Sequence, residues 1–134
     1  MRLKFSSKII DLLDLVRDQL SPQQDLFIVG GAVRDALLGR KLHDLDFAMS
    51  DNPTTLARNL AKRLDAGFFV LDDDRHTARV ILQNNEESFF PLDFVQFTGD
   101  GLREDLENRD FTINAMAVSI RDLAATIDPL GGKP

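Results

Sequence analysis

The chain has 134 residues, of which 43% are hydrophobic, and it carries a formal net charge of −6. This length suffices for one domain with a substantial core, and the acidic balance argues against strong RNA binding along an extended basic face. The sequence lacks cysteine, which excludes a disulfide framework and a cysteine metal site. It also shows no signal-peptide core or membrane-spanning run, so we expect a cytoplasmic protein with no membrane partner.

The first predicted element is an amphipathic helix over residues 6–20, whose apolar residues recur with helical spacing. Ser6 or Ser7 would cap its start. We interpret this helix as one that packs beside a sheet. A short apolar run over residues 26–29 follows, bounded by polar residues and glycine, and it predicts a buried strand.

A pair of glycines comes directly after that strand. Glycine has no Cβ and tolerates a positive φ, so Gly30 and Gly31 would let the backbone turn sharply and approach a ligand. The next segment opens a helix, whose first amides are unpaired, and Arg34 in its first turn could add a bidentate contact. A strand, a glycine turn and a helix N-terminus together are typical of a phosphate-binding site.

Two aspartates, Asp44 and Asp46, lie in the apolar stretch that follows. In a strand they would project from the same face, with Leu45 and Phe47 on the other. Because like charges repel, the two carboxylates would be stable mainly with a cation between them. Oxygen ligands beside a phosphate site favour Mg²⁺, and a pair of such ions could activate a hydroxyl and stabilise departing pyrophosphate. The motifs together predict a site for a metal-bound triphosphate.

Each motif also has a simpler interpretation. The glycine pair could be only a turn, and Asp44 and Asp46 could be solvated on a strand edge. Arg34 and Asp35 could form an ordinary pair on a helix surface. Because short motifs often match by chance, the prediction depends on the order and close spacing of all of them.

The middle of the chain predicts a second helix over residues 54–64, a hairpin of strands at residues 67–71 and 78–82, and a strand over residues 91–97. Asp93 is the only charged residue in the last of these strands. Two-metal sites usually need a further carboxylate from a neighbouring strand, so we predict Asp93 as the third metal ligand. The alternative is a solvent-facing aspartate on an edge strand.

The segment from Gly30 to Asp46 resembles the signature of the nucleotidyltransferase superfamily. More closely, it resembles class II tRNA nucleotidyltransferases (CCA-adding enzymes) and the related bacterial poly(A) polymerases. Residues 105–117, with the sequence DLENRDFTINAMA, resemble that family's second motif. Residues 128–132, DPLGG, resemble the segment that closes its catalytic head domain. The resemblance extends from about residue 26 to the end of the chain.

The resemblance implies a role for each matching residue. Asp44 and Asp46 would be the catalytic metal ligands, and Asp93 is the third carboxylate in our own prediction. Four residues would shape the triphosphate pocket: Gly30, Gly31, Arg34 and Asp35. Three residues would contact or support the incoming nucleotide: Arg109, Asp110, which would read the ribose hydroxyl, and Asn114. Asn108 stands where the family often has arginine, so no charge contact is expected from position 108.

For the fold we predict an α+β, or mixed α/β, architecture with a mostly antiparallel mixed sheet of about five strands flanked by helices. The resemblance implies the polymerase-β-like palm of nucleotidyltransferases. We expect one head domain over residues 1–134, made of an N-terminal helix within residues 1–24 and a catalytic core over residues 25–134. The family's neck, body and tail regions are absent, so we favour a fragment of a longer enzyme over a natural minimal version.

The predicted activity is template-independent transfer of a nucleotide from ATP or CTP to the 3′-hydroxyl of an RNA such as tRNA. Mg²⁺ would be the cofactor, and Arg34 and Arg109 would offset the charge of the departing pyrophosphate. CCA, CC and A addition and poly(A) synthesis all stay open, because the absent regions select among them. One alternative is a nucleotide-binding module without catalysis, and another is a purely structural domain.

Overall fold

The computed structural model describes residues 3–72, 76–83, 89–97, 117–121 and 126–127. In these ranges the chain forms three helices: α1 (Ser7–Asp18), α2 (Gly31–Leu37) and α3 (Pro53–Leu64). It also forms seven strands: β1 (Leu26–Val29), β2 (Leu45–Met49), β3 (Gly67–Asp72), β4 (Thr77–Gln83), β5 (Phe89–Gln96), β6 (Ala117–Ser119) and β7 (Thr126–Ile127). These bounds lie close to those predicted from the hydrophobic periods.

Local chemistry explains where two of the helices begin. At α1, the Ser6 hydroxyl oxygen accepts a hydrogen bond from the backbone N–H of Ile9 at 3.3 Å and so caps the helix. The first residue of α3 is Pro53, at a position where the missing N–H of proline would have no helical partner. In the described part of the chain, no helix is long and apolar enough to cross a membrane.

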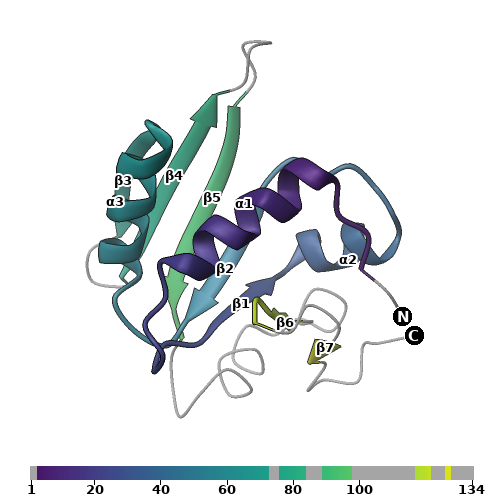
Figure 1. Ribbon diagram of the computed structural model, residues 1–134, viewed down its shortest axis with the longest axis horizontal. Helices are drawn as coiled ribbons and strands as arrows, with labels where there is room; N and C mark the ends of the chain where they lie inside the picture. Colours follow the sequence, from purple (N-terminus) through teal and green to yellow (C-terminus); the bar gives the residue numbers. More distant parts are fainter. Residues whose placement is uncertain (1–2, 73–75, 84–88, 98–116, 122–125, 128–134) are drawn as a thin grey trace.

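The described strands form one mixed sheet in the order β3-β4-β5-β2-β1-β6-β7 (Figure 1). Of their pairings, only β2 with β5 is parallel, and the others are antiparallel. The sheet is therefore mixed and mostly antiparallel, as predicted. It has two strands more than the five we expected, because β6 and β7 are three and two residues long and too short to show a period.

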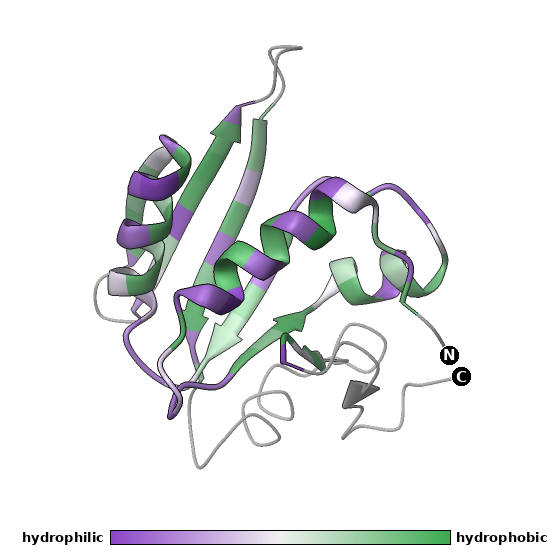
Figure 2. Cartoon of the chain, in the orientation of Figure 1, coloured by the Kyte–Doolittle hydropathy of each residue, from purple (hydrophilic) through white to green (hydrophobic). Residues whose placement is uncertain are grey.

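The two faces of the sheet are covered differently. Buried side chains of all three helices join the larger core on one face, where the rings of Phe47 and Phe94 stack with their centroids 4.8 Å apart. The opposite face carries a smaller cluster of Val29, Ala48 and Ala117. Figure 2 shows hydrophilic and hydrophobic bands alternating along α1 and α3, as expected for helices with one packed side. The three described helices therefore all pack on the same face of the sheet.

Candidate active site

The turn after β1 places a glycine against a carboxylate. Gly30 has φ 76° and ψ −148°, close to a region that is essentially restricted to glycine. A Cβ built on Gly30 would lie 3.5 Å from Oδ2 of Asp46. This proximity follows from the sheet, because Val29 pairs with Asp46 across β1 and β2. Gly31 differs from the prediction: it is the first residue of α2 and has no positive φ.

The predicted pair of aspartates lies at the start of β2. Asp46 is half-buried and lies inside β2. Asp44 is exposed and lies one residue before the strand begins. Leu45 and Phe47 are fully buried in the larger core. Because side chains alternate along a strand, Asp46 projects from the face opposite the helices.

Asp93 is next to Asp46 on the same face. The two residues are register partners in the parallel pair of β2 and β5. The strand β5 lies between β4 and β2, so the alternative that placed Asp93 on an edge strand is wrong. Arg79 on β4 is its register partner on the other side, and the guanidinium donates from Nε to Oδ1 at 2.7 Å and from Nη2 to Oδ2 at 3.0 Å.

Sequence reasoning missed Arg79, although a signal was present. Arg79 stands between Ala78 and Val80, two buried residues on the helix-covered face. Residues 77–80 alternate between polar and apolar, which indicates that Arg79 points to the face opposite the helices. Its ion pair with Asp93, however, depends on the register between two strands, which local sequence does not specify.

Charge on this face converges on the Arg79 guanidinium. Asp93 raises the pKa of Arg79 above its ordinary value, first through the hydrogen bond and then through its negative charge. Partial burial lowers this pKa, and the charges of Asp46 and Asp44 add smaller increases. The three predicted carboxylates are therefore close enough to act on one cation.

The donor chemistry fits a hard divalent cation bound by two carboxylates. Among the residues that the structure describes, no group of three or more His, Cys, Asp or Glu side chains is placed to hold a metal ion. Asp44 and Asp46 can supply the two carboxylates of such a site. Both oxygens of Asp93 accept hydrogen bonds from Arg79, but each keeps a further lone pair, so Asp93 stays the predicted third ligand. Mg²⁺ characteristically uses one or two carboxylates and completes its coordination with water and substrate phosphates.

Arg34 lies in the last turn of the seven-residue helix α2, not in the first turn as predicted. A Cβ built on Gly31 would lie 3.2 Å from Nη2 of Arg34, so the guanidinium is close to the glycine turn. Nε of Arg34 also contacts Oδ1 of Asp35 at 3.4 Å, with 40% and 21% of the two side chains exposed. The pair of Arg34 and Asp35 that the sequence suggested is thus present, and it lies beside the glycine turn. The predicted nucleotide contacts Arg109, Asp110 and Asn114 lie outside the described residues.

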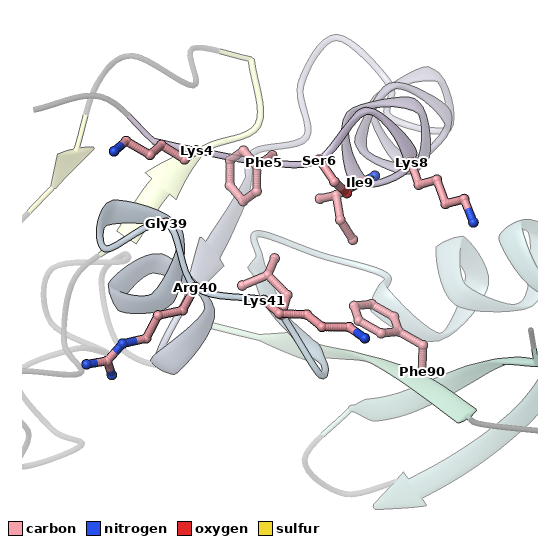
Figure 3. A pocket seen from close by; sticks show the side chains of 10 residues that line it. Lys4, Phe5, Ser6, Lys8, Ile9, Gly39, Arg40, Lys41 and Phe90 are labelled. Carbon is pink, nitrogen blue, oxygen red and sulfur yellow. Dashed lines mark hydrogen bonds between the residues drawn. The ribbon is translucent and has the colours of Figure 1, made fainter. Parts of the chain in front are cut away.

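A separate cavity of about 940 Å³ opens between the start of α1, the connection from α2 to β2, and β5. Figure 3 shows Phe5 and Ile9 on one wall and Phe90 on the other. These side chains pack against the larger core, so the cavity belongs to the helix-covered side of the sheet. Four basic residues also line it: Lys4, Lys8, Arg40 and Lys41. The carboxylates described above are on the opposite face.

Comparison with known proteins gives consistent matches over this region. Residues 26–134 match the family described as "Poly A polymerase head domain". A CC-adding tRNA nucleotidyltransferase of Synechocystis is 44% identical over 115 residues, which cover 84% of this chain and 26% of that protein. An A-adding tRNA nucleotidyltransferase of Deinococcus radiodurans is 41% identical over 106 residues, covering 79% and 22% respectively.

Solved structures give the same result. A CCA-adding enzyme in complex with ATP superposes with a TM-score of 0.82 at 31% identity, covering 96% of this chain and 31% of that one. The Thermotoga maritima CCA-adding enzyme in complex with tRNA superposes with a TM-score of 0.77 at 31% identity and the same coverage. The chain spans about a quarter of the length of the curated relatives named above and about a third of these solved chains.

Proposed function

We propose that this chain, which belongs to the family of poly(A) polymerase head domains, is the nucleotide-transfer domain of a tRNA nucleotidyltransferase. The observation that carries the proposal is the closeness of the Gly30 turn to the carboxylate of Asp46, which would lie 3.5 Å from a Cβ at residue 30. In this arrangement a nucleotide phosphate can approach the carboxylate without meeting a side chain at position 30. The fold, shared with a CCA-adding enzyme that binds ATP, supports the same assignment.

The reaction is transfer of a nucleotide to an RNA end. The 3′-hydroxyl oxygen of tRNA forms a bond to the α-phosphorus of ATP or CTP, the bond between that phosphorus and the bridging oxygen breaks, and pyrophosphate leaves. The hydroxyl proton passes to solvent. Little covalent chemistry is required of the protein in such a transfer, so catalysis depends on positioning and on charge stabilisation.

The residues of the chain divide this work. Asp44 and Asp46 would hold Mg²⁺, which when bound lowers the pKa of the attacking hydroxyl and neutralises charge on the leaving pyrophosphate. The pairing of β1 with β2 fixes Asp46 beside the glycine turn. Arg34, whose guanidinium is close to Gly31, would donate to a phosphate oxygen. Asp35 would orient Arg34 through their contact, and Asp93 remains a proposed third metal ligand. Arg109, Asp110 and Asn114 remain proposed nucleotide contacts.

We also propose that residues 1–134 form one head domain. Buried residues of α1, such as Leu13 and Val16, belong to the same core as those of β1 and β2, which supports treating the N-terminal helix as part of this unit. Base selection and most of the RNA grip would come from the neck, body and tail of a longer enzyme. The tRNA substrates of the relatives favour a cytoplasmic location.

The test is nucleotide binding by isothermal titration calorimetry with ATP, CTP, GTP and UTP, with and without Mg²⁺. We expect Mg²⁺-dependent binding with little base preference, lost in the double variant Asp44→Ala/Asp46→Ala. Asp11→Ala, an exposed aspartate on α1, is the matched control and should bind like the wild type. Retention of full affinity in the double variant would refute the proposed site.

A second assay separates the proposal from its alternative. Incubation with tRNA that lacks its 3′ end and with radiolabelled ATP or CTP measures incorporation directly. Incorporation that depends on Asp46 supports a catalytic head domain. Nucleotide binding without incorporation favours a nucleotide-binding module, an alternative consistent with a chain that spans only about a quarter of its relatives.

A further inference from the structure

Three charged residues form a row across three adjacent strands. Asp46 on β2 pairs with Asp93 on β5, and Asp93 pairs with Arg79 on β4. Neighbouring strands are roughly 5 Å apart, so the row places one cation and two carboxylates within a short distance on the same face. The row lies on the face where we place the proposed metal ligands.

The contact between Arg79 and Asp93 uses both carboxylate oxygens. The distances, 2.7 and 3.0 Å, are those of a two-pronged, charge-assisted pair. The two side chains are 38% and 26% exposed, and ion pairs on partly solvated surfaces contribute little to stability. A contribution to stability therefore explains poorly why the ion pair of Arg79 and Asp93 lies beside Asp46.

A divalent cation bound at Asp44 and Asp46 would be subject to the positive charge of the Arg79 guanidinium. The charges of both aspartates already act on Arg79. A metal ion that also used Asp93 as a ligand would share the carboxylate with Arg79 and would be repelled by the positive charge of the guanidinium. Without Arg79, a third carboxylate would be free to approach the ion, and one repelling positive charge would be gone.

We propose that Arg79 competes with the divalent cation for Asp93 and so keeps the affinity of the site for metal moderate. This inference rests on the proposed function, because it takes Asp44 and Asp46 as metal ligands. Arg79 is a positioning residue here, because it acts on the metal through Asp93. A moderate affinity suits a site at which metal arrives and departs with the nucleotide and pyrophosphate.

The test is titration with Mn²⁺, followed by the loss of the electron paramagnetic resonance signal of the free ion. Arg79→Met should bind Mn²⁺ about tenfold more tightly than the wild type, a difference of about 1.4 kcal/mol. Arg79→Lys, which keeps the charge but cannot grip both oxygens, should be intermediate. Arg17→Met is the matched control, because it removes a cation from a surface ion pair with Asp14 on α1.

A double-mutant cycle makes the role of Asp93 explicit. In the Asp93→Asn background, Arg79→Met should tighten Mn²⁺ binding much less than it does in the wild type, because no third carboxylate is released. An equal effect in both backgrounds, or an affinity that is unchanged or weaker in Arg79→Met, would overturn the proposal. A thermal melt of each variant confirms folding, and Arg79→Lys carries the test if Arg79→Met does not fold.

The outcomes also separate this inference from the function on which it rests. If the wild type binds no Mn²⁺, or if Asp44→Ala/Asp46→Ala binds as well as the wild type, the proposed metal site is wrong. If the double variant loses binding while Arg79→Met matches Arg17→Met, only the competition by Arg79 is wrong.

Discussion

The two neighbouring glycines should respond to the same substitution in opposite ways. At residue 30, φ is 76° and ψ is −148°, and alanine in such a conformation costs about 1–3 kcal/mol. The added methyl group would be 3.5 Å from Oδ2 of Asp46, an ordinary contact, so backbone strain dominates the cost. With about 2.1 cal/mol/K of unfolding entropy per residue, Gly30→Ala should lower the Tm of this 134-residue chain by about 4–10 °C.

Gly31 is the internal control, because it is already helical. Alanine is favoured over glycine inside helices by about 1 kcal/mol, and less at a first helical position, so Gly31→Ala should leave the Tm unchanged or raise it by at most about 3 °C. Its methyl group would be 3.2 Å from Nη2 of Arg34, the far end of a flexible side chain that can move aside. Gly31→Ala should therefore weaken triphosphate binding without loss of stability.

Differential scanning calorimetry of the wild type and both variants measures these shifts, and nucleotide titration measures the accompanying binding. A Tm for Gly30→Ala within about 1 °C of the wild type would refute the requirement for a positive φ at residue 30. An equal fall in Tm for both variants would show instead that the turn as a whole tolerates no added volume.

Two further predictions concern the core and the ion pair. Phe47→Ala should lower the free energy of unfolding by about 3–5 kcal/mol, because the ring is fully buried and stacked. Phe89→Ala, at a position 63% exposed, should lower it much less. Urea denaturation measures both values, and similar losses would contradict the assigned core. For Arg79, whose pKa is raised, any stability from its charge is fully present below the unfolded pKa and is lost only as the pH rises through the folded one. The stability difference between wild type and Arg79→Met should therefore stay constant between about pH 7 and 10, and a difference that shrinks over that range would count against the pairing.

Features written in local sequence were predictable. The strand at residues 26–29 has the expected bounds, because a short apolar run between glycine and polar residues has few other uses. The amphipathic period of α3 and the alternation in β5 were sufficient to place those elements. At the site, the positive φ of Gly30 followed from the absence of a Cβ, and the orientation of Asp46 followed from strand alternation.

Features that depend on the pairing of distant strands were not predictable. Nothing in residues 44–49 indicates that β5, rather than another strand, pairs in parallel with β2 and puts Asp93 next to Asp46. The partnership of Asp93 with Arg79 depends further on the register between β4 and β5. Whether Gly31 is helical depends on where α2 begins. A start one residue later would leave Gly31 in the turn.

The parallel pairing of β2 with β5 also has a consequence for the order in which the molecule is assembled. The turn at Gly30 and Asp46 are brought together by a local pairing of β1 with β2. Asp93 reaches them only after the chain has passed through α3 and the hairpin of β3 and β4 and returned to the centre of the sheet. Closing such a long connection is slow compared with forming a hairpin. The row of charges should thus form after the turn at Gly30 has met Asp46, so the glycine turn would be in place before the third carboxylate arrives.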